Sequence, residues 1–241
     1  MSAHELNAKM RALEIPRRMR ALPVDERGFL VPWFVAVIDG KPDHRVMDGT
    51  KWRQAIKFRL CWQCGEPLGS RGAFVLGPMC AVNRTNGEPP NHLDCARFAV
   101  RGCPHLSQPR ARRRGDPMEE YGELAKTPAG YGAKRNPGVI GIWVTKHWEV
   151  FKVPSHPGAG PGFLVQVGDP ERVEWFSEGR PATRAEVETS IEGGLPLLME
   201  KAEQQDREEP GAGAVKLLRR MLVRVGPYLP RGELPGEITA P

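Results

Sequence analysis

The five cysteines of this chain are confined to one short stretch, from Cys61 to Cys103 of 241 residues. Metal ligands must converge on one point, whereas cysteines that only fill an apolar core need not cluster in the sequence. The cysteine count is odd and the start of the sequence has no apolar secretory segment, which argues against a disulfide framework. We therefore expect a cytoplasmic protein with a thiol-based metal site.

Four ligands follow from the spacing within this stretch. Cys61 and Cys64 form a C-x-x-C pair, and the following Gly65 relieves the backbone where the turn reverses. His92 and Cys95 are three residues apart at the expected start of a helix, so they point from one face of its first turn. The sequence predicts that these four side chains bind one structural Zn²⁺, because their types and spacing suit a closed tetrahedral site.

This order of elements fits a treble-clef-like module, in which a cysteine knuckle, a β-hairpin and a ligand-bearing helix surround one ion. Residues 73–76 are apolar and β-branched or aromatic in part, which suits one arm of that hairpin. Three other residues are alternate ligands. Cys80 can replace His92 in a four-cysteine site, and Cys103 with His105 forms another candidate pair. A second ion lacks a clear fourth ligand, so we expect only one.

The same region bears on whether the chain is an enzyme. Treble-clef sites also occur in HNH-type endonucleases, whose hairpin carries a catalytic histidine, but residues 65–91 contain no histidine. The H-x-E and P-C-x-x-C signatures of zinc deaminases are absent too. Four protein ligands leave no open position for water, so the pattern predicts a structural ion, no catalytic residue and no small-molecule cofactor. A divergent, HNH-like metal-dependent nuclease is the enzymatic alternative.

Basic residues on either side of the metal region indicate that the chain binds a partner. The net charge is +6, and two arginine-rich stretches can contact phosphates, although they also suit solvated loops. We expect a zinc-stabilised, non-enzymatic protein that binds nucleic acid or a partner protein, with a phage structural or host-interaction protein as a further alternative. The candidate nucleic-acid-binding residues are Arg17, Arg18, Arg20, Arg110, Arg112, Arg113 and Arg114.

Strand and helix signals in the first half, together with those of the second half, predict an α+β fold. Residues 31–38 and 44–47 are rich in apolar and β-branched side chains and flank the turn Asp39-Gly40, so they predict a hairpin. Thr50 is the expected N-cap of a helix over residues 51–59.

In the second half, residues 139–145, 148–153 and 163–167 predict an antiparallel β-meander, which Glu174-Trp175-Phe176 can extend. Thr183 and Glu186 are spaced as a capping box that opens a helix. Gly193-Gly194 and Pro196 should interrupt this helix before it resumes over 197–205. Residues 214–225 are basic and amphipathic and predict a last helix.

Composition sets the divisions of the chain. No apolar run approaches the ~18 residues of a membrane helix, so we expect no membrane span. Gly and Pro, 27 and 24 residues, gather in turns and in a polar stretch between the halves. The expected segments are a basic N-terminal arm (1–23), a hairpin, helix and zinc-binding module (24–106), a linker or long loop (107–137), an antiparallel β-meander plus helix (138–209), and a basic helix with a disordered tail (210–241).

Three stretches resemble a family of uncharacterised bacterial and phage-encoded proteins with a treble-clef-like zinc site. They are PRRMRALPVDERGFLVPWFVA, CWQCGEPLG together with GPMCAVNR, and WFSEGRPATRAEV. The resemblance spans most of residues 16–200, and His105 and residues 207–241 lie outside it. It implies a coherent folding unit and no particular mechanism.

Overall fold

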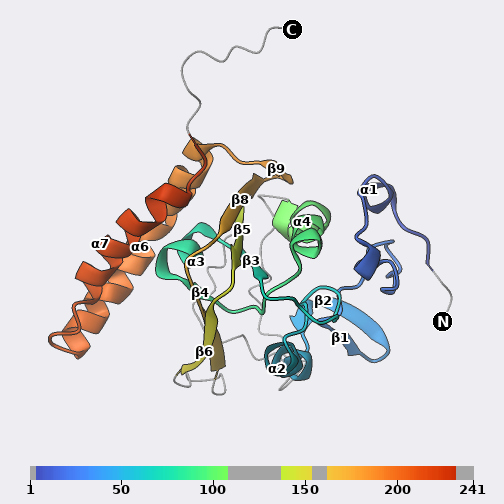
Figure 1. The fold of residues 1–241 in the computed structure, drawn as a ribbon, viewed down its shortest axis with the longest axis horizontal. Helices are drawn as coiled ribbons and strands as arrows, with labels where there is room; N and C mark the ends of the chain where they lie inside the picture. The colour runs from blue at the N-terminus through green and yellow to red at the C-terminus, as the bar shows by residue number, and fades with distance from the viewer. Residues whose placement is uncertain (1–3, 108–136, 154–161, 232–241) are drawn as a thin grey trace, which may run out of the picture.

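The chain contains both helices and antiparallel strands in the computed structural model, which describes residues 4–107, 137–153 and 162–231 (Figure 1). This mixed α+β class is the one that the sequence predicts. The helices are α1 (Ala8–Arg11), η1 (Arg17–Met19), α2 (Gly49–Phe58), α3 (Pro78–Asn83), α4 (Leu93–Gly102), α5 (Pro104–Ser107), α6 (Arg184–Glu208), α7 (Ala214–Val225) and η3 (Gly226–Tyr228). The strands are β1 (Val35–Ile38), β2 (Lys41–Met47), β3 (Gly72–Leu76), β4 (Thr85–Asn86), β5 (Val139–Thr145), β6 (Trp148–Val153), β7 (Gly162–Val167), β8 (Arg172–Ser177) and β9 (Arg180–Pro181).

One long, kinked β-ribbon forms the centre of the molecule. β5 pairs with β8, placing Val144 opposite Arg172, and β6 pairs with β7, placing Trp148 opposite Val167. The two pairs therefore continue each other, with β5 and β6 as one arm and β7 and β8 as the other. The predicted meander differs from this arrangement in one respect. β6 pairs with β7 as expected, but β5 pairs with β8 and not with β6.

The kink between the two parts of the ribbon has a local cause. The Thr145 hydroxyl donates to the carbonyl of Asp169 at 2.9 Å, which holds the two arms together where the regular ladder stops. Gly168 approaches the backbone of His147 so closely that a Cβ would lie 2.6 Å from its carbonyl oxygen. Because glycine has no side chain, the two arms of the ribbon can stay in contact with each other at the kink.

Strands from both halves of the sequence share the two larger sheets, whose orders are β3-β5-β8-β9 and β4-β7-β6. β3 pairs with β5 along its whole length, and β4 pairs with β7. The sequence predicts β3 as an arm of a hairpin inside the cysteine module. The strand is present, but it pairs with β5, and α3 follows it directly in the sequence. Its link to the cysteine module is a single β-bridge between Ala73 and Asn91.

Helices cover both faces of the β3-β5-β8-β9 sheet, with α4 on one side and α3, α6 and α7 on the other (Figure 1). Phe74 and Trp143 belong to the core under α6 and α7, whereas Ile140 and Ile142 pack in a second core with residues of α4. β5 is consequently buried at every position, as expected for a strand covered on both faces.

α6 departs most clearly from the expected pattern. Thr183 and Glu186 form the predicted capping box, but the helix then runs unbroken to Glu208 through Gly193, Gly194 and Pro196. Gly194 packs against Met79 of α3, and a Cβ at this position would lie 2.6 Å from the Met79 Cγ. This tertiary contact holds the helix where its own residues favour a break. α7 has the predicted bounds.

In the first half, β1 and β2 form the predicted hairpin around Asp39 and Gly40. α2 begins earlier than expected, at Gly49, because Asp48 is its N-cap: the Asp48 carboxylate accepts from the backbone N–H groups of Thr50 and Lys51 at 2.8 and 3.2 Å. The prediction of Thr50 as N-cap is therefore wrong. A carboxylate also interacts favourably with the helix dipole at this end.

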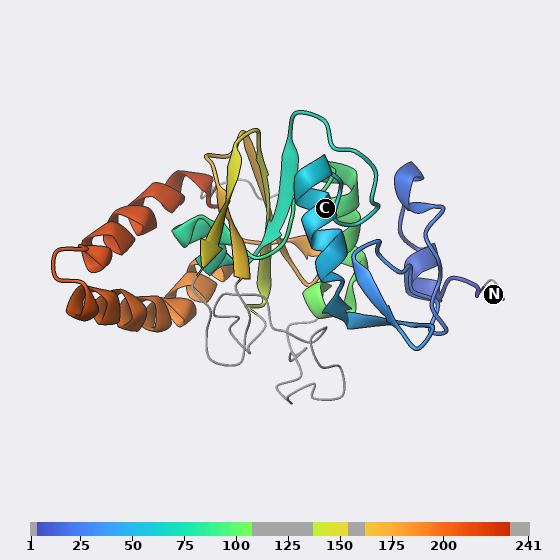
Figure 2. The same cartoon turned by 90° about the horizontal axis from the view of Figure 1, so that it is seen from below.

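The N-terminal segment packs on the body of the molecule. Met10 of α1 and Met19 of η1 are 2% and 1% exposed. This segment and the α6–α7 hairpin lie at opposite ends of the molecule (Figure 2). Within the described ranges, no helix combines the length and the apolar composition that crossing a membrane requires.

Candidate metal centre

Cys61, Cys64, His92 and Cys95 converge in the folded chain, with one ligand atom of each within 4.8 Å of every other. They are the four residues that the spacing of the sequence predicts. Cys61 and Cys95 are fully buried, and Cys64 is 9% exposed. Between the two pairs in the sequence lie β3, α3 and β4, so the pairs meet only through the tertiary fold.

The first pair lies on a tight turn that closes between Leu60 and Pro67, which form an isolated antiparallel bridge. The Cys61 N–H donates to the carbonyl of Glu66, and the Gly65 N–H donates to the carbonyl of Cys61, both at 2.8 Å. Gly65 has φ +77° and lies against the Trp33 ring, so a side chain there would be strained and would clash. These constraints turn both thiols to the same side.

The second pair lies at the start of α4, but the helix begins one residue later than expected. His92 is the N-cap, in an extended conformation, and the helix proper starts at Leu93. The His92 N–H donates to the Cys61 Sγ at 3.4 Å, which joins the helix start to the cysteine turn. Cys95 stands in the first turn of the helix and directs its Sγ to within 4.0 Å of the His92 Nδ1.

The imidazole of His92 is oriented by both of its nitrogens. Its Nδ1 lies 3.5 Å from the Cys64 Sγ, and its Nε2 lies 3.0 Å from the carbonyl oxygen of Pro67. A carbonyl only accepts, so Nε2 carries a proton and a neutral ring has its Nδ1 lone pair facing the thiols. This is the second contact that metal-binding histidines ordinarily make.

The four donors fit a single tetrahedral ion. With metal–sulfur bonds of about 2.3 Å, the ligand atoms of a tetrahedral site lie about 3.8 Å apart. No two of the ligand atoms here are more than 4.8 Å apart, so shifts of the order of 1 Å bring all four into a coordination sphere. A Cys₃His set of this kind can hold a metal ion.

Protonation within the cluster is uneven. Burial opposes ionisation of Cys61, but hydrogen bonds from Cys64, Cys95 and His92 outweigh it and lower the pKa of the Cys61 thiol. Hydrogen bonds to Cys61 and Cys64 raise the pKa of His92 to about 10, although burial acts in the opposite direction. Hydrogen bonds to the same two thiols, followed by burial, raise the pKa of Cys95. Negative charge on Cys61 is thus stabilised by the hydrogen bonds of the other three side chains, and a bound metal ion would take over that role when it displaces their protons.

Apolar residues of the N-terminal segment enclose this polar cluster. Met10, Met19, Leu30 and Phe98 form a buried cluster with the three cysteines. Arg18 adds an ionic contact, because its guanidinium lies 3.4 Å from a carboxylate oxygen of Glu66 and 3.2 Å from one of Asp94. One arginine thus joins the cysteine turn to the start of α4. The sequence leaves two alternatives for residues 1–23, a mobile arm or a helix docked on the body, and the apolar spacing of Leu6, Met10 and Leu13 is the signal that favours docking.

The alternate ligands do not join the cluster. Among the described residues, only the four named side chains form such a group. Cys80, on α3, packs against the core under α6 and α7. Cys103 is the C-cap of α4, and burial raises the pKa of its thiol, while His105 lies on α5.

The predicted nucleic-acid-binding residues have different positions. Arg17, Arg18 and Arg20 are exposed at and beside η1, and Arg18 is the residue paired with Glu66 and Asp94. The arginine run lies outside the described residues; it comprises Arg110, Arg112, Arg113 and Arg114.

Comparison with models of protein families, with curated proteins and with solved structures gives no match to this chain.

Proposed function

We propose that the chain is a zinc-stabilised, non-enzymatic binding protein in which Cys61, Cys64, His92 and Cys95 hold one structural Zn²⁺. The observation that carries the proposal is the convergence of three sulfur atoms and one imidazole nitrogen within 4.8 Å. Thiolate and imidazole ligands favour Zn²⁺ over Mg²⁺ or Ca²⁺, which prefer oxygen. Four protein donors complete a tetrahedron without a water ligand, which supports a structural role.

The arrangement of the ligands supports a treble-clef-like module in a modified form. A cysteine turn supplies one pair and the start of α4 supplies the other, as such a module requires. The strand between them, β3, belongs to the central sheet, so the ion would link that sheet, α4 and the N-terminal segment. A reducing compartment such as the cytoplasm would keep the thiols available.

Nucleic acid is the partner that we propose. Arg17 and Arg20 are exposed on the segment that covers the cysteine cluster, and the run of arginines at 110–114 follows α5 closely in the sequence. The net charge of +6 favours binding to a polyanion. A partner protein is the other outcome that a binding experiment can reveal.

Zinc content tests the first part of the proposal. Protein purified without chelator should contain one equivalent of zinc by mass spectrometry, and less than about half an equivalent would overturn the proposal. Cys64→Ser should lose the ion, because one of the four donors is removed. Cys80→Ser and Cys103→Ser are matched controls that should retain it, and zinc loss in Cys103→Ser would contradict the ligand assignment.

Salt-dependent binding tests the second part. Fluorescence anisotropy with labelled DNA and RNA should show an affinity that falls as salt is added. In a plot of the logarithm of the association constant against the logarithm of the salt concentration, each phosphate contact should add about 0.9 to the downward slope. Alanine at all four arginines of the 110–114 run should reduce that slope while the zinc content stays at one equivalent. No binding at low salt would overturn the choice of nucleic acid and leave the metal site intact. Cleavage of DNA or RNA with Mg²⁺, Mn²⁺ or Zn²⁺ would contradict a non-enzymatic role.

A further inference from the structure

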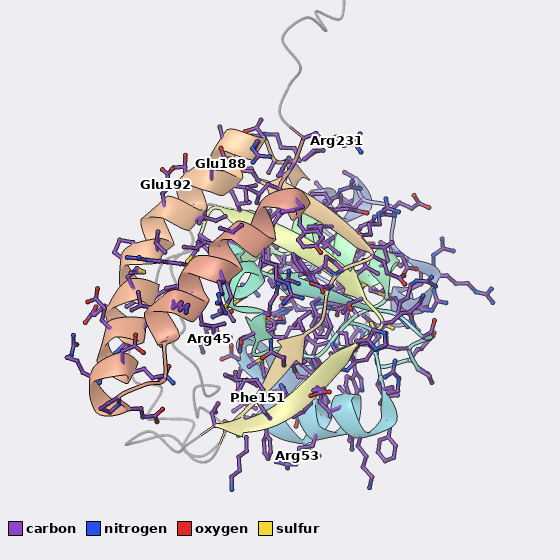
Figure 3. All side chains as sticks on the ribbon, turned by 60° about the vertical axis from the view of Figure 1, so that its left-hand side comes forward. Arg45, Arg53, Phe151, Glu188, Glu192 and Arg231 are labelled. Carbon is purple, nitrogen blue, oxygen red and sulfur yellow. The ribbon has the colours of Figure 1, made fainter. Side chains whose placement is uncertain are left out.

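The α6–α7 hairpin carries two rows of opposite charge on one face. Asp206 of α6 faces α7, because its carboxylate accepts from the backbone N–H groups of Ala214 and Val215 at 2.6 and 3.1 Å. At about 100° per residue, Glu192 and Glu203 lie about 40° and 60° around α6 from Asp206, on the same flank. Both are exposed, and Glu192 projects from α6 away from the sheets (Figure 3).

The basic row lies on α7. Lys216, Arg219 and Arg220 are exposed and, at helical spacing, share one flank with Val223. Arg224 stands on another flank, where it pairs with Asp169 at the turn between β7 and β8. The basic row is therefore directed away from the side of α7 that meets the sheets.

Neither row is neutralised within the described part of the chain. No ion pair there involves Glu192 or Glu203, and none involves the three cations of α7. The carboxylate of Asp206 lines the same hollow as the basic row, but it already accepts hydrogen bonds from the backbone N–H groups that begin α7.

A hollow of about 620 Å³ accompanies the basic row. Its lining includes Val215 and Val223 beside Lys216, Arg219 and Arg220. Val223, a large aliphatic residue, is 79% exposed. An exposed apolar residue within a charged rim is typical of a surface that contacts another protein.

The charge pattern selects among partners. A nucleic acid would meet the carboxylates of Glu192 and Glu203 together with the cations, and an acidic peptide would meet the same repulsion. A second copy of the chain has the complementary pattern, because a two-fold axis lays α6 of one copy against α7 of the other and repeats the contact. Both rows are then neutralised at once.

We propose that two copies of the chain associate through this hairpin face, with the Glu192–Glu203 row of each copy against the Lys216–Arg220 row of the other. α7 has 12 residues, so the shared helix length is about 18 Å. The contact is smaller than the ~800 Å² per partner of a standard interface, so we expect a weak dimer with a dissociation constant of about 10–100 µM. Its affinity should fall as salt screens the two rows.

Charge exchange tests the proposal by analytical ultracentrifugation over a concentration series up to several hundred micromolar. Arg219→Glu with Arg220→Glu makes both rows acidic, and Glu192→Lys with Glu203→Lys makes both rows basic. Each double variant alone should be monomeric. An equimolar mixture should form heterodimers at least as strong as the original dimer, because both contacts are then complementary.

Two controls separate this result from misfolding and from nonspecific charge effects. All altered side chains are exposed, so circular dichroism and thermal unfolding should match those of the original chain. Arg53→Glu with Lys57→Glu, on the exposed face of α2, changes the net charge equally and should leave the dimer unchanged. A chain that stays monomeric at low salt, or a mixture that does not associate, would overturn the proposal.

Discussion

The cysteine region and the α6–α7 hairpin obtain their order from different sources. Around the cysteines the elements are short, with four residues in α1 and ten in α4, and the centre contains three cysteines and a half-buried histidine. The hairpin consists of helices of 25 and 12 residues that bury apolar side chains between them and against the sheet. Short elements around polar groups need an additional link, whereas long amphipathic helices do not. We therefore expect the first region to depend on a metal ion and the second to be independent of it.

Metal removal should produce the largest difference between the two regions. Structural zinc contributes about 10–16 kcal/mol of apparent binding free energy in zinc-finger peptides near neutral pH. With EDTA, or in Cys64→Ser, backbone amides of residues 6–30, the cysteine turn and α4 should exchange rapidly with deuterium. Amides of α6 and α7 should keep their protection. Mass spectrometry of hydrogen exchange measures both, and an equal loss of protection in the two regions would show that they form one cooperative unit.

Met19→Ala should have the next largest effect. Met19 is 1% exposed in the cluster that encloses the cysteines, and truncation of a buried methionine costs about 2–5 kcal/mol. Urea unfolding with zinc present should show this loss. With EDTA the loss should shrink, because the segment that Met19 anchors is then already released. Val223→Ala, on the exposed flank of α7, is the control and should change stability by less than about 0.5 kcal/mol.

The contrast between the regions also explains which features the sequence could predict. The four ligands were predictable, because side chains that bind one ion must fall at a few allowed spacings, here C-x-x-C and H-x-x-C. The partner of β3 was not, because β5 lies more than sixty residues away and local periodicity carries no information on pairing.

Helix boundaries show the same limit. The capping box at Thr183 identified the start of α6, since its two hydrogen bonds are local. Its continuation through Pro196 depends on packing against α3, which local propensity does not contain. Docking of Met10 and Met19 likewise rests on contacts with α4 and the cysteine turn, which are distant in sequence.

Pro196→Ala should stabilise the hairpin moderately. Proline inside a helix lacks an N–H and costs up to about 3 kcal/mol relative to alanine, so the exposed Pro196 position should gain about 1–3 kcal/mol. Gly194→Ala should have the opposite effect, because its Cβ would meet the Met79 side chain at 2.6 Å. Thermal unfolding of both variants tests whether packing on α3 or intrinsic propensity controls this part of α6. A higher unfolding temperature in both variants would contradict the packing role assigned to Gly194.

Glu174→Gln should have the smallest effect, at the point where the metal-bearing helix meets the sheet. Arg97 of α4 donates to Glu174 of β8 at 2.8 and 2.5 Å, and Arg172 lies 2.6 Å from the same carboxylate. The hydrogen bonds from Arg97 lower the pKa of Glu174, against the opposing effect of burial. At pH 7 the substitution should cost about 1 kcal/mol, since the pair is partly exposed.

The pH dependence of that cost identifies its origin. Because the pKa of Glu174 in the folded chain is below its ordinary value of 4.5, its ionic contribution is fully present above pH 4.5 and is lost as the pH falls through the folded pKa. The stability difference between the original chain and Glu174→Gln, measured by urea unfolding from pH 7 downward, should therefore narrow in acid. Taking the difference removes the effect of acid on the metal site, which both proteins share. Glu149→Gln, on the exposed part of β6, serves as the control and should show a small difference at every pH. A cost for Glu174→Gln that stays constant into acid would mean that side-chain packing, and not charge, joins α4 to β8.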